Sequence, residues 1–177
     1  MNKINDFDKL SIFDFDGTLI NTPLSTLENK EKWAEYHGRE YPYTGWWGRE
    51  ESMDKDVFEI TPRKHVVDYY IKERRTPNTM IIMLTGRPKK LSHIVEGILG
   101  ENNLIFNKYL YNRGGKTINE KIIQIIDILK ETPTIRYIEM WDDRVEHIPL
   151  FNNFGNKLLD DNVVDDFKVN YIKSDHH

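Results

Sequence analysis

The sequence predicts an α/β fold, a three-layer sandwich in which helices cover both faces of a mostly parallel sheet. Apolar runs with strand character alternate along the chain with segments that have the period of amphipathic helices. Such alternation implies right-handed βαβ crossovers. Several of these strands also end in polar residues, which would meet at one edge of the sheet. The sequence therefore predicts both the fold and the edge that carries its site.

The length, net charge and composition of the chain limit the classes of protein to which it can belong. The chain has 177 residues, a net charge of −4 and no cysteine. This length suits one domain, here taken as residues 1–177 with a modest insertion. The acidic balance argues against a broad surface that coats nucleic acid, and the lack of cysteine excludes disulfides and thiolate chemistry.

The location of the protein in the cell is predicted only by default. The chain has no apolar signal region and no run long enough to span a bilayer, so we expect a cytoplasmic protein with no membrane role and no obligate protein partner. The terminal pair His176-His177 is typical of an expression tag and is set aside.

The first strand is expected at about residues 10–15, and the stretch that follows is different in kind. Residues 20–60 are rich in charged and aromatic side chains and show no strong period, apart from a short helix at 28–36. This composition predicts a small cap or lid inserted after the first strand. Thr61-Pro62 then predicts a helix start, with Thr as the N-cap and Pro at the first helical position.

The middle of the chain predicts a strand, a helix and a strand. Residues 80–84 are continuously apolar, as in a strand buried on both faces. Residues 91–99 carry apolar side chains at helical spacing, and Gly100 is expected to end this helix. The third strand lies within residues 104–111.

The last third of the chain repeats the alternation. Thr117-Ile118-Asn119-Glu120 has the pattern of a capping box and predicts a helix start. A fourth strand is expected at 135–141 and a last helix at 147–154, with Gly155 beyond its end. A final strand is expected at 167–172, after an acidic loop.

The stretch Asp14–Thr18 is the first candidate site. Alternation in a strand directs Asp14 and Asp16 the same way, and Gly17 permits a tight turn. Adjacent carboxylates repel one another, so they stabilise a strand end poorly. They suit a magnesium site, or a nucleophile with an acid/base partner.

Four motifs in order resemble the haloacid dehalogenase (HAD) superfamily of phosphotransferases. They are Asp-x-Asp-Gly-Thr after the first strand, a Thr that ends a later strand, a Lys at a helix start, and an acidic pair after a strand. Here they correspond to Asp14–Thr18, Thr85, Lys121 or Lys116, and Asp142-Asp143. The resemblance covers about residues 10–172 outside the insertion and implies a Rossmann-like sandwich.

Two groups within the superfamily look most similar. One is the 3′-phosphatase domain of phage-type polynucleotide kinases, through Thr85-Gly86-Arg87 and Asp142-Asp143-Arg144. The other is the group of Swiss Army Knife RNA repair-like proteins, through Trp46-Trp47, Leu84-Thr85-Gly86-Arg87, Asp143, Arg144 and His147.

The resemblance also implies roles for these residues. Asp14 would attack phosphorus and form an aspartyl-phosphate, and Asp16 would serve as acid and then base. A magnesium ion would bind Asp14, the Asp16 carbonyl and Asp143, with Asp142 behind them. Thr85 and the lysine would hold the phosphoryl oxygens.

Several assignments remain open at this stage. For the lysine of the third motif, the position of Lys121 beside the apolar face of its predicted helix favours it over Lys116. The pair Trp46-Trp47 either stacks on a base or packs the insertion onto the core. The remaining candidates for substrate contact are Thr18, Arg87 with its planar fork, Arg144 (which alternatively pairs with the neighbouring aspartates), His147 and Arg113.

The expected function is that of a Mg²⁺-dependent phosphomonoesterase. The favoured substrate is a nucleotide or a nucleic-acid 3′-phosphate end, and the alternative is a small phosphorylated metabolite. A non-catalytic phosphate-binding module is the alternative from another class.

Overall fold

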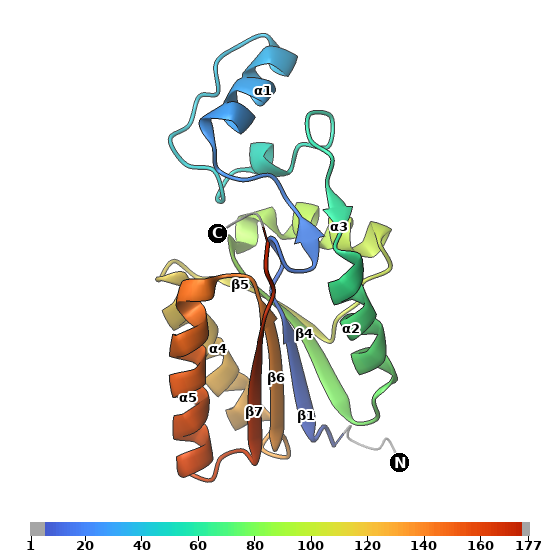
Figure 1. Ribbon diagram of the computed structural model, residues 1–177, viewed down its shortest axis with the longest axis vertical. Coiled ribbons are helices and arrows are strands. Elements are labelled where there is room, and N and C mark those ends of the chain that lie inside the picture. The colour runs from blue at the N-terminus through green and yellow to red at the C-terminus, as the bar shows by residue number, and fades with distance from the viewer. Residues whose placement is uncertain (1–5, 175–177) are drawn as a thin grey trace.

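The computed structural model describes residues 6–174 and shows a three-layer α/β sandwich (Figure 1). The terminal pair His176-His177 lies outside this range. The central sheet has the order β5-β4-β1-β6-β7, and every neighbouring pair in it is parallel. The predicted fold class is confirmed. The strands are β1 (Lys9–Phe13), β4 (Thr79–Pro88), β5 (Lys108–Asn112), β6 (Tyr137–Asp142) and β7 (Asp166–Tyr171).

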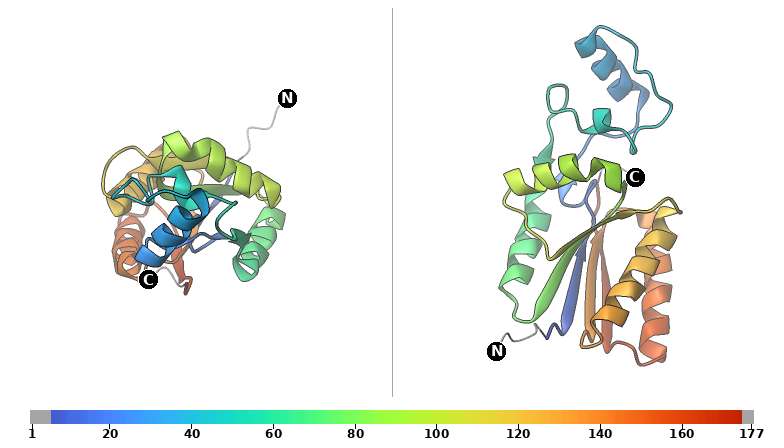
Figure 2. Two further views of the ribbon diagram at one scale, coloured as in Figure 1. Left: turned by 90° about the horizontal axis from the view of Figure 1, so that it is seen from above. Right: turned by 180° about the vertical axis from the view of Figure 1, so that it is seen from behind.

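Helices cover both faces of the sheet (Figure 2). Helices α2 (Lys64–Arg75) and α3 (Ser92–Glu101) lie on one side, and α4 (Thr117–Glu131) and α5 (Ile148–Asp160) lie on the other. Short 3₁₀ turns are η1 (Glu50–Met53), η2 (Lys89–Leu91) and η3 (Val145–His147). Within residues 6–174, no helix combines the length and apolarity needed to cross a membrane.

The sheet is buried on both faces by alternation along its strands. Ile12 and Ile82 pack in the core beneath α4 and α5, whereas Phe13 and Met83 pack beneath α2 and α3. The Phe13 ring stacks on Trp141 with centroids 4.4 Å apart. Burial of each such side chain stabilises the fold by about 1.5–3 kcal/mol, so the ends of the central strands β1, β4 and β6 are held firmly.

The segment between β1 and α2 forms a separate layer above the carboxyl ends of the strands (Figure 1). Its base is a two-stranded ribbon of β2 (Ile20–Asn21) and β3 (Thr61–Pro62), and above it lies α1 (Leu27–His37). The helix expected at 28–36 is confirmed, and the Thr26 hydroxyl caps it by accepting a hydrogen bond from Asn29 N at 3.1 Å. Three aromatic side chains form the buried centre of this segment, Trp33, Trp46 and Phe58.

The helix start predicted at Thr61-Pro62 is wrong. These residues pair with β2, and α2 begins at Lys64. The backbone N–H of Arg63 donates to the Leu19 carbonyl at 2.8 Å, so the chain stays extended until the ribbon is complete. A long-range pairing overrides a good local capping sequence here.

The predicted capping box is also wrong. Helix α4 begins at Thr117 with no side-chain cap. The Glu120 carboxylate instead accepts from Arg113 Nε at 2.9 Å. The Thr117 side chain lies against Gly86, where an added Cβ would come within 2.8 Å of Thr117 Cγ2.

Two glycines do not end helices as predicted. Helix α3 continues through Gly100, and the left-handed turn that follows is made by Asn103 at φ 58°. Helix α5 continues through Gly155, where a Cβ would lie 2.2 Å from Cδ1 of Phe167 on β7. Gly155 is therefore a site of close helix-to-strand packing rather than a helix stop.

Candidate active site

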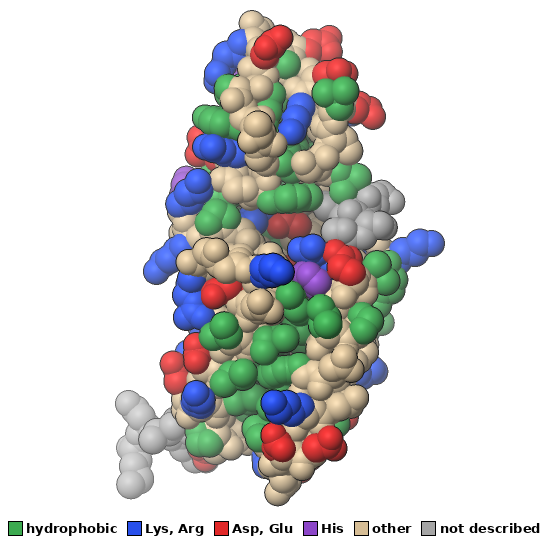
Figure 3. Space-filling view, turned by 90° about the vertical axis from the view of Figure 1, so that its left-hand side faces the viewer, with side chains coloured by type: hydrophobic (Ala, Val, Ile, Leu, Met, Phe, Trp, Pro, Cys, Tyr) green, Lys and Arg blue, Asp and Glu red, His purple; other side chains and the backbone are tan. Residues whose placement is uncertain are grey.

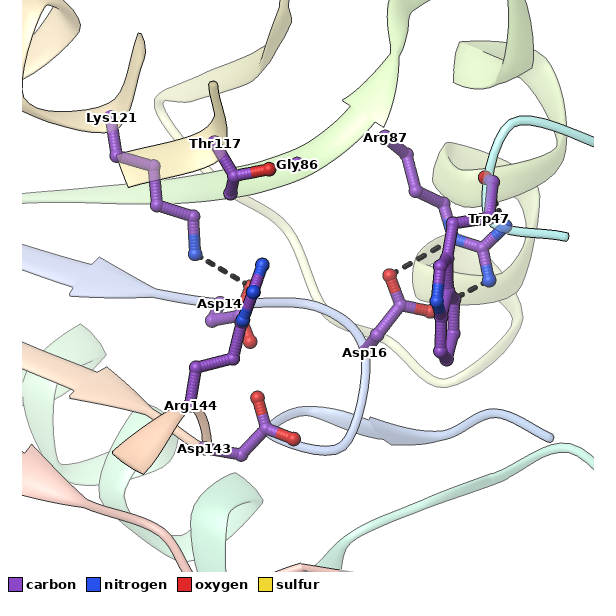
Figure 4. Close-up of a pocket in the computed structure, with 9 residues that line it drawn as sticks. All are labelled: Asp14, Asp16, Trp47, Gly86, Arg87, Thr117, Lys121, Asp143 and Arg144. Atoms are coloured by element: carbon purple, nitrogen blue, oxygen red, sulfur yellow. Dashed lines mark hydrogen bonds and ion pairs between the residues drawn. The ribbon is translucent and has the colours of Figure 1, made fainter. Parts of the chain in front are cut away.

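A pocket of about 230 Å³ lies at the carboxyl edge of the sheet, beneath the insertion (Figure 4). Parallel sheets carry ligand sites at this edge. Figure 3 shows charged side chains of both signs gathered where the insertion meets the α4/α5 side of the molecule. The pocket is lined by Asp14, Asp16, Trp47, Gly86, Arg87, Thr117, Lys121, Asp143 and Arg144.

Asp14 directly follows β1, and both of its carboxylate oxygens have hydrogen-bond donors. The Thr18 hydroxyl donates to Oδ2 at 3.0 Å, and Lys121 Nζ donates to Oδ1 at 2.9 Å. Gly17, at φ 68°, makes the turn that brings Thr18 back to Asp14. Thr18 is fully buried and outside the pocket lining. The prediction that it contacts substrate is therefore corrected, because its hydroxyl orients Asp14 instead.

Lys121 is the lysine that the fold brings to the site. It lies one turn into α4, its side chain is 2% exposed, and its Nζ also donates to Asp142 Oδ2 at 2.7 Å. Burial opposes its charge, but Asp14 and Asp142 outweigh this and hold the pKa of Lys121 above its ordinary value. Lys116 precedes the helix and is exposed.

Three buried carboxylates form an acidic cluster, Asp14, Asp142 and Asp143, with one oxygen from each lying within 4.8 Å of the others. Asp142 is turned toward Lys121 and also accepts from Arg144 N at 3.0 Å. Asp143 lines the pocket and accepts from the Ser174 hydroxyl at 2.7 Å. Burial and the nearby Asp142 raise the pKa of Asp14 well above its ordinary value, although Lys121 opposes this. Clustered hard oxygen donors of this kind fit a divalent cation.

Asp16 lies apart from this cluster and is held by Arg87. Arg87 Nε donates to both carboxylate oxygens at 3.0 and 2.9 Å, and an Arg87 terminal nitrogen donates to Oδ1 at 2.7 Å. The other terminal nitrogen of Arg87 donates to the Trp47 carbonyl and the Ser52 hydroxyl. Arg87 was predicted to grip substrate phosphate with its planar fork; in the structure that fork is on Asp16.

Thr85 is buried behind the pocket wall. Its hydroxyl accepts from Arg87 N at 3.1 Å, and the pocket is lined at this point by the next residue, Gly86. The Thr85 hydroxyl, which was predicted to hold phosphoryl oxygens, therefore lies outside the pocket lining and is bonded to the Arg87 backbone.

The two adjacent tryptophans separate in space. Trp47 lines the pocket, with the Arg87 guanidinium carbon 5.3 Å from its ring centroid. Trp46 is buried in the insertion, where its Nε1 donates to the Pro23 carbonyl at 2.9 Å. The substrate-binding interpretation of Trp46 is wrong, because its ring packs the insertion instead.

The remaining candidates for substrate contact differ in their position relative to the pocket. Arg144 lines the pocket, but its guanidinium pairs with Glu146 at 2.9 Å rather than with the aspartates. His147 is buried, and within the described residues its Nδ1 has no hydrogen-bond partner. Burial, followed by the charge of Arg144, lowers its pKa. Arg113 is exposed, pairs with Glu120 and lies outside the lining.

Sequence reasoning missed four residues at or near the site. They are Thr22, which donates to Asp16 Oδ1 at 2.7 Å, Ser52, Thr117 and Ser174. Two signals could have identified Ser174 and Thr117. Ser174 follows the carboxyl end of β7, and Thr117 lies one turn before Lys121 on the same helix. No local pattern identifies Ser52.

The parallel sheet carries an acidic cluster and a buried lysine at its carboxyl edge. Residues 25–177 match the family described as HAD domain family 1 in Swiss Army Knife RNA repair proteins, and the chain belongs to that family. The resemblance drawn from the motifs is confirmed.

Similarity to individual proteins is lower. An uncharacterized protein of Saccharomyces cerevisiae is 27% identical over 174 residues, covering 85% of this chain and 37% of the yeast protein. The chain therefore spans little more than a third of that relative.

Solved structures share the fold. A chain of the Pnkp1/Rnl/Hen1 complex is 16% identical with a TM-score of 0.54, covering 93% of this chain and 47% of that one. A HAD-like hydrolase from Streptococcus pneumoniae is 11% identical with a TM-score of 0.55, covering 93% of this chain and 95% of that one. The HAD domain of the effector Lem4 from Legionella pneumophila is 13% identical with a TM-score of 0.56, covering 97% and 88%.

Proposed function

We propose that this domain is a Mg²⁺-dependent phosphomonoesterase that forms an aspartyl-phosphate on Asp14, with a nucleotide or nucleic-acid 3′-phosphate end as its favoured substrate. The arrangement of Asp14 carries the proposal. Its carboxylate faces the pocket with one oxygen on Lys121 and the other on Thr18. A carboxylate fixed in this way is preorganised to attack.

The chemistry requires two steps. An Asp14 oxygen attacks phosphorus, the bond to the ester oxygen breaks, and Asp16 gives that oxygen its proton. Asp16 then takes a proton from water, the water oxygen attacks the aspartyl-phosphate, and inorganic phosphate leaves with Asp14 regenerated. Lys121 and the backbone of Gly86 border the space where the phosphoryl oxygens would lie.

The cation would be held by Asp14, Asp143 and the Asp16 backbone carbonyl. Asp142 would act from behind, since its oxygens face Lys121 and the Arg144 backbone. When bound, the cation would neutralise charge on the phosphoryl oxygens. Asp14, Asp142 and Asp143 are buried together, so a divalent cation would also relieve their mutual repulsion.

The choice of a nucleic-acid end is supported by two observations. The Trp47 ring and the Arg144 guanidinium border the pocket, and they suit a base or sugar and a phosphate respectively. The family is described from RNA repair proteins. We take residues 20–60 as a lid on a single domain, because Trp47 and Ser52 of this segment bond to Arg87.

A small-metabolite phosphatase is the second candidate. The net charge of −4 favours it, because a polymer of phosphates meets repulsion beyond the pocket. The pocket of about 230 Å³ would hold a sugar phosphate or a mononucleotide.

The test compares phosphate release, with Mg²⁺, from a 3′-phosphorylated oligonucleotide and from a panel of mononucleotides and sugar phosphates. Asp14→Asn should abolish release, whereas Asp165→Asn, at a surface carboxylate paired with Arg136, should leave it intact. Preference for the oligonucleotide supports end healing, and preference for small esters supports the second candidate. Release from neither substrate set would favour a binding module and contradict the proposal.

A further inference from the structure

We propose that Arg87 and Ser52 are positioning residues through which the inserted segment fixes the direction of Asp16, so that proton transfer to the leaving group requires the insertion to be seated. This inference rests on the proposed function, in which Asp16 is the acid and base. It assigns to Arg87 a role toward Asp16 rather than toward the substrate phosphate.

The guanidinium is nearly immobilised. Arg87 is 1% exposed, and it makes three hydrogen bonds to Asp16 and two to the insertion. The bonds to Trp47 O and Ser52 Oγ measure 2.9 and 2.7 Å. The planar fork thus has one edge on Asp16 and another on the insertion, so one rigid group joins the two contacts.

The second contact of Asp16 also comes from this part of the chain. Thr22, directly after β2, donates to Asp16 Oδ1 at 2.7 Å and is buried. Within residues 6–174, the two side chains that donate to the Asp16 carboxylate are therefore both located by the inserted segment: Thr22 belongs to it, and Arg87 is bonded to it.

Asp16 is placed where a leaving group would depart. In Figure 4, Asp14 and Asp16 approach the pocket from different sides, and Asp16 points toward Arg87. Attack by Asp14 requires the ester oxygen to leave on the far side of phosphorus, in line with the attacking oxygen. A carboxylate on the opposite wall of the pocket is suited to protonate that oxygen, provided that its direction is maintained.

The expected defect depends on the leaving group. An alkyl phosphate releases a basic alkoxide and needs the acid, whereas p-nitrophenyl phosphate releases a stable phenolate and does not. Because kcat/KM reports the steps up to departure of the leaving group, misdirection of Asp16 should lower kcat/KM for the alkyl ester selectively. General acid–base catalysis contributes about 10²–10⁴-fold, which sets the scale of the loss.

The experiment measures kcat/KM for an alkyl phosphate and for p-nitrophenyl phosphate, with Mg²⁺, in three variants of the full chain. Ser52→Ala removes the hydroxyl that accepts from Arg87, and Arg87→Lys removes the fork. Ser11→Ala is the matched control, because Ser11 is an equally buried serine whose hydroxyl donates to Glu73 at 2.8 Å, outside the pocket lining. It should change neither value.

Ser52→Ala should lower kcat/KM for the alkyl phosphate by about tenfold and kcat/KM for p-nitrophenyl phosphate by less than about twofold. Arg87→Lys should lower kcat/KM for the alkyl phosphate by about 100-fold. Equal losses on both esters, in Ser52→Ala and Arg87→Lys alike, would indicate a merely structural role and overturn this inference while the proposed function stands. No Asp14-dependent release by the unaltered protein would overturn the proposed function, and the inference with it.

Discussion

At the scale of single residues, the charge of Lys121 decides how the acidic cluster is tolerated. Its Nζ lies 2.9 Å from Asp14 and 2.7 Å from Asp142, all three side chains being buried. Lys121→Met keeps the volume and removes the charge, so it should destabilise the fold by about 3 kcal/mol at pH 7, as expected when a buried pair loses one partner. Urea denaturation measures this. Lys116→Met, at an exposed lysine, should change stability by less than about 0.5 kcal/mol, and an equal effect in both variants would contradict the argument.

The sequence indicated the position of a side chain where a regular element sets its direction. The end of β1 directs Asp14 to the edge of the sheet, and the apolar face of α4 places Lys121 beside it. It did not indicate that position where the direction depends on a distant contact. Arg87 reaches Asp16 across 71 positions of sequence, and Trp46 turns into the insertion although Trp47 does not. No local period carries this information.

At the scale of elements, Gly155 sets how closely α5 packs on β7. Ala normally stabilises a helix interior by up to about 1 kcal/mol relative to Gly. At position 155 the new Cβ would meet Phe167 at 2.2 Å, so Gly155→Ala should destabilise by about 1–3 kcal/mol. Gly97→Ala in α3, with nothing within 4 Å of the added Cβ, should be neutral or stabilising. Thermal unfolding of both variants checks the contrast, and stabilisation by Gly155→Ala would show that the helix and strand can separate without cost.

A second element-scale feature is a polar cluster that ties four elements together. Lys9 on β1 pairs with the buried Glu73 of α2 at 2.6 Å and with Glu139 of β6 at 3.0 Å, and Asn170 of β7 donates to Glu139 at 2.9 Å. Burial opposes the charge of Glu139, but Asn170 and Lys9 outweigh it and lower its pKa below the ordinary 4.5.

This tie predicts a pH dependence of stability. Because the folded-state pKa of Glu139 is lowered, its stabilising contribution is complete above pH 4.5 and is lost as the pH falls through the folded-state value. Glu139→Gln should therefore be less stable than the unaltered protein at pH 7, with the difference shrinking toward pH 3. Urea midpoints at the two pH values measure it. A difference independent of pH would mean that packing, not charge, carries the effect.

Element positions followed the sequence closely, and element ends did not. The strand at 80–84 was predicted from a continuous apolar run, because a parallel sheet buries both faces of its central strands. The ends of α3 and α5 were misjudged because Gly100 and Gly155 were taken as stops, whereas both lie inside a helix. A glycine selected for close packing and one selected for a left-handed turn look alike in sequence.

At the scale of the whole molecule, the inserted segment has a core of its own and is also tied to the main body. Aromatic packing around Trp33 and Trp46 gives the insertion its own small core. Its contacts with the main body include Met53 in the core beneath α2 and α3, the ion pair of Lys55 with Glu101 of α3, and the bonds to Arg87. The composition of residues 20–60 predicted a separate covering segment, but its seating on Arg87 depends on backbone and hydroxyl groups that carry no sequence signature.

Cation binding should be visible as a property of the whole fold. A divalent cation that binds the native cluster, but not the unfolded chain, stabilises by about 2.7 kcal/mol at a hundred times its Kd. For a chain of this length, Mg²⁺ should then raise Tm by about 5–10 °C. Asp143→Asn removes a carboxylate of the cluster and should abolish most of the shift, whereas Asp165→Asn, at a surface pair with Arg136, should retain it.

Because the cation competes with protons for carboxylates whose charge is disfavoured by burial, the Mg²⁺-induced shift in Tm should diminish as the pH is lowered. A shift that Asp143→Asn leaves unchanged would place the cation elsewhere on the protein and separate metal binding from the proposed chemistry.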